Sequence, residues 1–411
     1  MFKYFFLFIT LIMHCAYANE LEVLHWWTSN GEMQATKLLK KTMESQGYTW
    51  KDFAVAGGGG ESAMAVLKAR AVAGNPPTAA QIKGKDIQEW AHLGFLSTLT
   101  SVATQEKWDK VLPSFLKKIM LYKGQYVAVP INIHRVNWLW INPNIFKKMQ
   151  LKIPTTLTEF FNVADKLKTA GYIPLAHGGQ PWQDTTLFEI VALSVLSQDE
   201  YKQAFVDLNM QTLTSPKMIE VFRYFKKLHQ YIDTNAPGRT WNQATQMLIK
   251  GDAAMQLMGD WVKGEFTMAH KKAGKDFICV VAPGTQGKFS YNIDSFVFFK
   301  NATQEQKGQE DIATSVMSKP FQLSFSLVKG SIPARNDISI TALDSCSQQS
   351  MLDLHQAQQQ GNLVPSLSQS MATTTYVQSA ISEIVSEFFN NPNSDAKKAP
   401  QRLAKAIKAA L

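Results

Sequence analysis

The sequence predicts an α/β fold made of two lobes, each a mostly parallel sheet flanked by helices. Three observations lead to this prediction. Segments with strand and helix patterns alternate along the chain, which is typical of parallel sheets with helices on their faces. The chain of 411 residues is too long for one compact core. Its halves are not separated by a low-complexity block or a long flexible linker, so we expect several short crossings between the lobes.

The N-terminal half opens with alternating strands and helices. Residues 21–25 (LEVLH) alternate as a strand does, and apolar residues at helical spacing predict a helix from about Glu32 that Gly47 ends. The stretch "FAVAGGGG" indicates a second strand that breaks into a glycine turn. A helix is expected next in "ESAMAVLKARAVAG", and "NPPTAAQIKG" then indicates a turn and a short strand.

The same alternation resumes after a break near residue 130. A helix is expected in "TTLTEFFNVADKLKTAG", where Thr156 and Glu159 form a capping box and Gly171 marks the end. Further helices are expected in "MIEVFRYFKKLHQYI", in "WNQATQMLIKG" and in the tail, and strands in "DAAMQLMGDW", "FICVVAPG" and "YNIDSFVFFK". The expected lobes are an N-terminal lobe of residues 19–130 with 295–335 and a C-terminal lobe of residues 131–294 with 336–411.

Residues 1–18 have the features of a cleaved secretory signal peptide. An apolar run at residues 5–13 follows a charged start, and the sequence AYA before the cleavage point has the small residues that a signal peptidase accepts. A lipoprotein signal would need a small residue before Cys15, where His14 stands. The alternative, an uncleaved anchor, is disfavoured because the run is too short to span a bilayer comfortably. We therefore expect an exported, periplasmic protein.

The cysteines and the net charge narrow the possible classes of protein and partner further. Cleavage leaves Cys279 and Cys346, and two thiols in an exported chain predict one disulfide, with two buried free thiols as the alternative. The formal net charge is +9, but the basic residues are interspersed with acidic ones. Nucleic acid is therefore not an expected partner.

The motifs of common enzyme reactions are missing from the sequence. It lacks the GxSxG, HExxH, Walker lysine and EF-hand patterns, and its eight histidines are never paired at metal-ligand spacing. We therefore expect no catalytic residues, no cofactor and no metal site. The glycines at 57–60 could hold an anion at a helix N-terminus, but we favour a flexible turn that lets backbones approach closely.

The tryptophans are the strongest indication of a ligand. Many of the ten stand in expected loops beside polar residues, as in "HWWTSNGE", "NIHRVNWLW", "GGQPWQD", "GRTWNQ" and "MGDWVKGE". Each one alone is more often a core residue. Together they predict a polar ligand with apolar faces, and a pyranose is such a ligand. Its C–H faces stack on indole rings, while its hydroxyls form strong hydrogen bonds with charged groups.

Several stretches resemble the extracellular solute-binding proteins of bacterial ABC sugar importers, in the maltose-binding-like family 1, and within it the glucose/mannose-binding branch. They are "LEVLHWWTSNGE", "AGNPPTAAQIKG", "VAVPINIHRVNWLWIN", "GDAAMQLMGDW" and "VAPGT" followed by "DSFVFF", and the resemblance covers the whole mature chain. It implies a type II periplasmic-binding-protein fold, whose two lobes close on a sugar in the cleft between them. It also implies a monomer that delivers a monosaccharide, glucose before others, to a membrane permease.

The resemblance also implies which residues bind the sugar. Trp26 and Trp27 should stack on or beside the ring, and Glu32 should accept hydrogen bonds from hydroxyls. For Trp27 the alternative is that it closes the core of its own lobe. The complete predicted set comprises Trp26, Trp27, Glu32, Gln81, Lys83, His134, Trp261, Asp294, Lys329 and His355, with Trp182 and Trp241 as weaker candidates.

Other functions stay open at this point. The same fold could bind a disaccharide, or a non-sugar solute such as a polyamine or an amino acid. An exported glycoside hydrolase would need two carboxylates beside the glycosidic bond, and Glu32, Asp260 and Asp294 could supply them. The lysines and histidines among the candidates favour a neutral, hydroxylated ligand.

Overall fold

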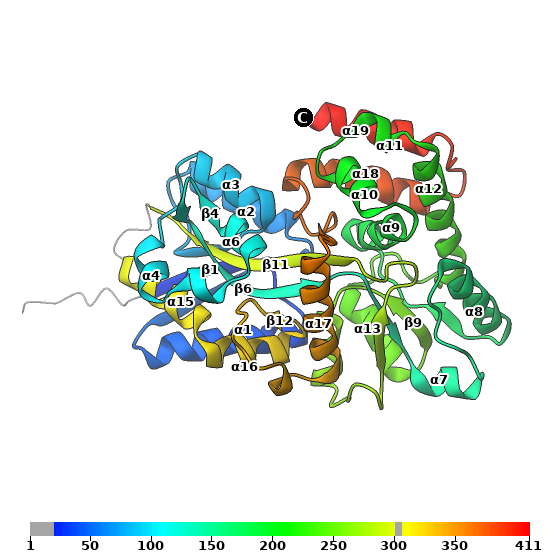
Figure 1. Ribbon diagram of the computed structural model, residues 1–411, viewed down its shortest axis with the longest axis horizontal. Coiled ribbons are helices and arrows are strands. Elements are labelled where there is room, and N and C mark those ends of the chain that lie inside the picture. The colour runs from blue at the N-terminus through cyan, green and yellow to red at the C-terminus, as the bar shows by residue number, and fades with distance from the viewer. Residues whose placement is uncertain (1–19, 301–305) are drawn as a thin grey trace, which may run out of the picture.

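The two lobes lie side by side, each with a sheet enclosed by helices (Figure 1). The computed structural model of this protein describes residues 20–300 and 306–411. The predicted two-lobe α/β fold is confirmed, whereas the predicted signal peptide, residues 1–18, lies outside the described residues. Within the two described ranges, no helix has both the length and the apolar character needed to cross a membrane.

The first lobe is built on the larger sheet, with strand order β12-β6-β11-β3-β1-β2 and with β13 paired to β11. β1 runs parallel to β2 and β3. β6 is antiparallel to β11 and β12, because β6 leads the chain out of this lobe and β11 leads it back. The predicted parallel pairing therefore holds for part of the sheet, which is mixed. The strands are β1 (Glu20–His25), β2 (Thr49–Ala54), β3 (Ala79–Gln81), β6 (Ala128–Arg135), β11 (Phe289–Phe298), β12 (Ile332–Pro333) and β13 (Leu363–Pro365), besides a separate hairpin of β4 (Leu121–Tyr122) and β5 (Gln125–Tyr126).

The second lobe is built on a smaller sheet with strand order β10-β7-β9-β8. β8 and β9 pair in parallel, while β7 is antiparallel to both of its neighbours, so this sheet is also mixed rather than mostly parallel. Its strands are β7 (Trp138–Ile141), β8 (Ile173–Leu175), β9 (Ala253–Leu257) and β10 (Ile278–Val281).

Helices cover both sheets and bury separate hydrophobic cores in the two lobes. Those of the first lobe are α1 (Asn30–Ser45), α2 (Glu61–Val72), α3 (Gly84–His92), α4 (Thr100–Gln105), α5 (Trp108–Val111), α6 (Ser114–Met120), α15 (Gln306–Met317) and α16 (Lys319–Lys329). Those of the second lobe are α7 (Pro143–Lys148), α8 (Leu157–Thr169), α9 (Pro181–Val195), α10 (Gln198–Phe205), α11 (Met210–Leu213), α12 (Pro216–Leu228), α13 (Trp241–Lys250), α14 (Val262–Met268), α18 (Thr375–Asn390) and α19 (Ala399–Ala410).

Local signals in the sequence set where helices begin and end. α1 begins with a capping box: the Ser29 side chain accepts from the Glu32 N–H, and the Glu32 carboxylate accepts from the Ser29 N–H. The predicted capping box of Thr156 and Glu159 starts α8 in the same way. Gly47, just after α1, has a φ of 90°, a conformation that glycine adopts without steric cost. These helices therefore start and end close to where the sequence predicts.

The described chain passes between the lobes at three places. β6 leads into β7, β10 leads back into β11, and residues 366–374 connect β13 with α18. β6 and β11 are neighbours in the larger sheet, and their pairing extends to Arg135 and Tyr291. Both strands therefore continue across the expected lobe boundaries at residues 130 and 294.

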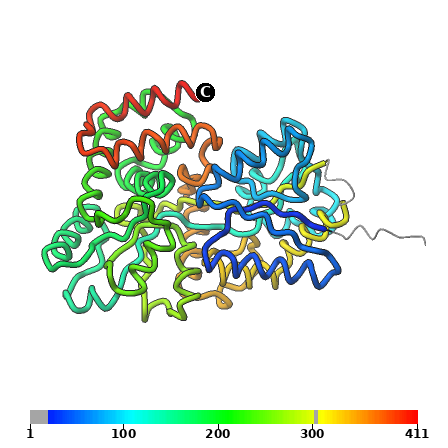
Figure 2. Tube along the Cα trace, turned by 180° about the vertical axis from the view of Figure 1, so that it is seen from behind, coloured from blue at the N-terminus to red at the C-terminus, as the bar shows by residue number. Residues whose placement is uncertain are grey.

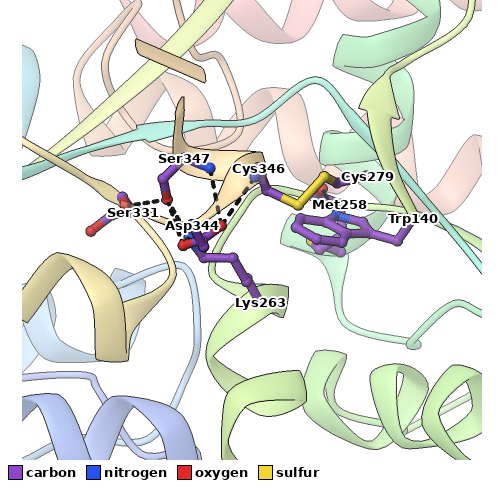
Figure 3. Close-up of a disulfide and its surroundings, with 8 residues drawn as sticks. All are labelled: Trp140, Met258, Lys263, Cys279, Ser331, Asp344, Cys346 and Ser347. Atoms are coloured by element: carbon purple, nitrogen blue, oxygen red, sulfur yellow. Dashed lines mark hydrogen bonds and ion pairs between the residues drawn. A yellow bond between two sulfur atoms is a disulfide. The ribbon is translucent and has the colours of Figure 1, made fainter. Parts of the chain in front are cut away.

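α17 (Ser345–Gln359) stands between the two lobes and is tied to both (Figure 1). Its residues Met351 and Leu354 belong to the core of the first lobe. Near its start, Cys346 forms a disulfide with Cys279 of β10 in the second lobe (Figure 3). The predicted disulfide is confirmed, and it fastens this helix to the edge of the smaller sheet.

A buried lysine beside the disulfide strengthens the same junction (Figure 3). Lys263 of α14 donates hydrogen bonds to the Asp344 carboxylate and to the Ser347 hydroxyl at the start of α17. Ser347 in turn donates to the carbonyl of Ser331, next to β12. The start of α17 is therefore bonded to an element of each lobe.

Candidate functional site

A narrow cavity lies between the two lobes, with about 280 Å³ between its lining atoms, of which only about 20 Å³ is open to a water-sized molecule. Its wall in the first lobe is formed where β1 and β3 end and α1 begins, and its wall in the second lobe comes from α9, α13 and the start of α14. The polar and aromatic side chains around it are buried. The lining residues are Trp26, Trp27, Glu32, Gly58, Lys83, His134, Trp182, Trp241, Trp261, Asn292, Asp294, Lys329 and Gln369.

A larger groove, with about 480 Å³ open to a water-sized molecule, lies between α17 and β10. Its charged lining residues already have partners: Arg135 pairs with Asp353 and donates to the carbonyl of Lys288. None of the predicted sugar-binding residues lines it. We therefore take the smaller, enclosed cavity as the candidate site.

The adjacent tryptophans Trp26 and Trp27 both line the cavity, but their surroundings differ. Trp27 is 2% exposed and packs against Phe296 and Phe325, with ring centroids 5.8 and 5.5 Å away. It therefore also fills the core of the first lobe, as the alternative interpretation of this residue expects. The ring of Trp26 has the ammonium of Lys83 at 5.0 Å from its centroid, a cation–π arrangement at the cavity wall.

Asp294 of β11 is the centre of a buried polar network. Its Oδ1 accepts a hydrogen bond from Gln81 over 3.0 Å and lies 3.4 Å from the Nζ of Lys83. Burial disfavours the charged carboxylate, but Lys83 and His134 outweigh burial and hold the pKa of Asp294 well below its usual value. Burial lowers the pKa of Lys83, against the attraction of Asp294.

His134 of β6 links two carboxylates. Its Nε2 lies 3.1 Å from Oδ2 of Asp294, and its Nδ1 bonds to Oδ1 of Asp260. Burial opposes a charged imidazole, yet Asp260 and Asp294 outweigh burial and raise the pKa of His134. Asp260 also accepts from the backbone N–H of Arg135 over 2.9 Å. The ring of Trp261 meets that of His134 edge-on at 5.5 Å, so the network continues into the second lobe.

A second ion pair lies in the wall of the cavity. Lys329, the last residue of α16, donates to Oε1 of Glu32 over 3.0 Å. The other oxygen of Glu32 accepts from the backbone N–H groups of Thr28 and Ser29, each at 3.2 Å. Glu32 therefore caps α1 and pairs with Lys329 at once. It was expected to accept from ligand hydroxyls, and here both of its oxygens already have donors.

Three tryptophans form the wall of the second lobe: Trp182 of α9, Trp241 at the start of α13 and Trp261 just before α14. The rings of Trp182 and Trp261 lie 6.2 Å apart. A Cβ at Gly58 would stand 2.6 Å from Nε1 of Trp182. The glycine run therefore gives the close backbone approach that the sequence predicts, and its partner is the aromatic wall of the opposite lobe.

Two predicted residues lie away from the cavity wall. Gln81 stands one layer behind it, where it donates to Asp294 and its Oε1 lies 3.4 Å from the N–H of Trp26. His355 is exposed on α17 and is not among the lining residues. The expectation that His355 faces the cleft is therefore wrong, because α17 packs with its other face, Met351 and Leu354, on the first lobe.

Three lining residues were missed from the sequence: Gly58, Asn292 and Gln369. Asn292 stands two positions before Asp294 on β11, and residues two apart on a strand face the same side. That periodicity could have identified it. Gln369 lies in the third crossing between the lobes, where no local pattern in the sequence indicates which side chain faces the cleft.

Three of the lining residues carry a buried polar atom without a partner. Among the described residues, the buried Trp261 Nε1, Asn292 Oδ1 and Gln369 Nε2 have no hydrogen-bond partner. An unsatisfied buried polar atom costs about 1–3 kcal/mol, so a bound polar molecule that satisfies them is favoured. In the described part of the chain, no three His, Cys, Asp or Glu side chains are grouped as a metal ion would require.

This enclosed, polar and aromatic cavity between two lobes agrees with the family to which the sequence can be assigned. Residues 33–313 match the family model of the bacterial extracellular solute-binding proteins. The chain belongs to this family. This solute-binding protein is 46% identical over 393 residues to a "probable sugar-binding periplasmic protein" of Rhizobium meliloti (strain 1021). The match covers 96% of this chain and 94% of the relative.

Two further comparisons extend this result. An "uncharacterized ABC transporter extracellular-binding protein" of Pyrococcus horikoshii is 30% identical to this solute-binding protein over 396 residues, covering 95% of this chain and 88% of the relative. The solved structure of the bacterial solute receptor AcbH, described as exclusively preferring β-D-galactopyranose, superposes with a TM-score of 0.78 at 17% identity. It covers 95% of this chain and 97% of the receptor. At that identity the structural likeness establishes the fold alone.

Proposed function

We propose that this solute-binding protein is the periplasmic sugar-binding component of an ABC importer. It encloses one monosaccharide, with glucose as the first candidate, and delivers it as a monomer to a membrane permease without chemical turnover. The relative from Rhizobium meliloti is named as a sugar-binding protein, which supports the sugar class, and the relative from Pyrococcus horikoshii is named as an ABC transporter protein, which supports the transporter class. The choice of glucose rests on the resemblance of the sequence to the glucose/mannose-binding branch.

The observation that carries the proposal is the composition of the cavity wall. Five tryptophans from both lobes supply flat apolar surfaces: Trp26, Trp27, Trp182, Trp241 and Trp261. Charged and amide side chains line the cavity wall together with these tryptophans. A pyranose has apolar C–H faces and a rim of hydroxyls, so it satisfies both kinds of surface at once.

The charges around the cavity favour a neutral ligand. Lys83 is paired with Asp294, and Lys329 is paired with Glu32. A cationic or anionic solute would bring one unpaired charge into this buried site, and burying a charge without a partner is costly. A neutral hydroxylated solute can accept from the lysines and donate to the carboxylates without changing that balance.

The unpartnered atoms fit the same class of ligand. Trp261 Nε1 and Gln369 Nε2 are donors, and Asn292 Oδ1 is an acceptor. A hydroxyl group both donates and accepts, so one sugar can serve both kinds of atom. A ligand that only accepts, such as a carboxylate, would leave Asn292 unsatisfied.

The size of the cavity favours a monosaccharide over a disaccharide. The space open to a water-sized molecule is about 20 Å³, far below the roughly 300–1,000 Å³ that small-molecule sites usually occupy, so even one sugar ring needs the lobes or the side chains to move apart. The surrounding side chains are buried, so a second ring would need the lobes to stand further apart. A disaccharide therefore stays the alternative ligand.

Hydrolysis is disfavoured by the contacts of the available carboxylates. Asp260 and Asp294 bond to the two nitrogens of the same imidazole, His134. Glu32 is held by Lys329 and by two backbone N–H groups. A glycosidase needs one protonated and one ionised carboxyl group facing the bond to be cleaved, and these three side chains serve other partners.

Thermal unfolding of residues 19–411 against a panel of mono- and disaccharides tests the proposal, with polyamines and amino acids as controls. A ligand that binds only the folded state raises the melting temperature by mass action. We expect a rise with glucose or a close epimer, and a one-to-one complex in calorimetry. A rise with a control solute and none with any sugar would overturn the sugar assignment.

A further inference from the structure

Outside the cavity, a buried carboxylate of the second lobe reaches the start of a helix in the first lobe. Glu265 of α14 is 1% exposed, and its Oε1 accepts a hydrogen bond from the backbone N–H of Gly31 over 2.9 Å. Gly31 is the second residue of α1, where backbone N–H groups lack partners within the helix. The partial positive charge of a helix N-terminus favours a carboxylate there.

A second contact runs in the opposite direction: a carboxylate of the first lobe reaches the start of a helix in the second lobe. Asp86, in the first turn of α3 in the first lobe, is 4% exposed. Its carboxylate accepts from the N–H of Thr375 over 3.0 Å and from the Thr375 hydroxyl. Thr375 is the first residue of α18 in the second lobe. The start of α18 lies beside α2 and α3 of the first lobe in both views (Figures 1 and 2).

Glycines let the backbones of the two lobes approach at both contacts. A Cβ at Gly31 would lie 2.9 Å from the carbonyl carbon of Gly264, next to Glu265. A Cβ at Gly84, two residues before Asp86, would lie 2.4 Å from the carbonyl oxygen of Ser370. Gly31 belongs to the helix that receives a carboxylate, whereas Gly84 belongs to the helix that carries one and approaches the crossing that leads into α18.

We propose that Asp86 and Glu265 are reciprocal latches that stabilise the closed arrangement of the two lobes without touching the ligand. Both side chains lie outside the set of residues that line the cavity. When the lobes separate, each contact is exchanged for water, so each latch adds to the affinity for any solute that the cleft encloses. They are positioning residues, and the proposal uses the proposed function only for its choice of ligand.

The test compares alanine variants of each latch with the wild type. Glu265→Ala and Asp86→Ala are expected to weaken sugar binding by roughly 3- to 30-fold each, the equivalent of losing one helix cap. The loss is expected mainly in a faster dissociation rate. Asp86→Asn is expected to bind sugar at least as tightly as the wild type, because asparagine caps a helix about as well as aspartate and brings no charge into the buried contact.

Two further variants separate closure from folding. Thr156→Ala removes a cap that lies within the second lobe, so it is expected to lower the melting temperature of the ligand-free protein and to leave sugar affinity unchanged. Gly31→Ala places a methyl group against Gly264, so it is expected to weaken binding and to increase the radius of gyration of the sugar-bound protein in X-ray scattering.

The outcomes decide the two proposals separately. Alanine variants of Asp86 and Glu265 that bind sugar as tightly as the wild type, or that lose only ligand-free stability as Thr156→Ala does, overturn the latches. If the wild type binds no sugar, the proposed function is overturned instead. The comparison of the variants is then repeated with whichever control solute raises the melting temperature of the wild type. If no solute binds, scattering of the ligand-free protein decides, and identical radii for wild type and both alanine variants overturn the latches.

Discussion

Asp294 of β11 and Lys83, which follows β3, form an ion pair at the wall of the cavity, with 3.4 Å between Oδ1 and Nζ. Both are almost completely buried. Because Lys83 also has Gln369 as a partner at 3.2 Å, this cluster joins a strand of the first lobe to the third crossing between the lobes. The charges are thus placed where a ligand and both lobes meet.

Replacing Asp294 separates its role toward a ligand from its role toward Lys83. Asp294→Ala is expected to cost about 1.5–3 kcal/mol of sugar binding, the range for a hydrogen bond to a charged group. Titration calorimetry measures the loss. Asp294→Asn keeps one acceptor oxygen and is expected to lose less. Unchanged affinity together with a large drop in ligand-free stability would make Asp294 a structural residue.

The two adjacent tryptophans are expected to respond differently to truncation. Trp27 packs on Phe296 and Phe325, so Trp27→Ala is expected to cost about 3–5 kcal/mol of unfolding free energy. Trp26→Ala is expected to cost less stability and to weaken sugar binding. Urea unfolding and calorimetry on both variants measure the two quantities. Equal losses of stability would remove the distinction.

The disulfide between Cys279 and Cys346 is expected to contribute strongly to stability. It closes a loop with a sequence separation of 67 residues, for which the loop-entropy model gives about 4 kcal/mol. The variant with both cysteines changed to serine is expected to unfold at a lower urea concentration. A loss below about 1 kcal/mol would mean that α17 is held by its other contacts, such as those of Lys263.

Asp86 is expected to make stability depend on pH. Burial raises its pKa from 3.8 to about 6, against the hydrogen bonds from Thr375, with Glu89 and Lys68 as the nearby charges. A carboxyl group whose pKa is raised by folding binds protons more tightly in the folded state. Its contribution is therefore greatest below about pH 4 and is lost as pH rises through about 6.

Asp86→Asn removes this titration. At pH 8 the variant is expected to be more stable than the wild type by an amount on the order of 2–3 kcal/mol, and at pH 4 the two should be similar. Urea unfolding at both pH values measures the difference, and the comparison cancels all other titrating groups. A difference that does not change between pH 4 and pH 8 would contradict the raised pKa.

Short-range patterns in the sequence predicted the helices and strands well. The capping box at Thr156 and the glycine after α1 depend on neighbouring residues only, and such signals can be read without the fold. Most of the predicted site residues were found through family stretches, and the structure brings them to one cavity. Their role in binding a sugar stays a prediction.

Contacts between distant segments could not be predicted from local patterns. Glu32 and Lys329 are 297 positions apart, and nothing near Glu32 indicates that its free oxygen meets a lysine. His355 was misplaced because the sequence does not say which face of α17 is buried. Asp86 and Glu265 were not predicted either, since their partners are backbone N–H groups that exist only once the lobes are assembled.

The ring of tryptophans around the cavity also gives the protein a built-in optical reporter. Five of its ten tryptophans line the cavity. A ligand would therefore lie against half of the indole rings that contribute to the tryptophan fluorescence. Sugars are colourless and silent in the ultraviolet, yet their arrival should change the emission of this protein without any dye or label. Rapid mixing with fluorescence detection can therefore follow loading and release of the solute in real time on the unmodified chain.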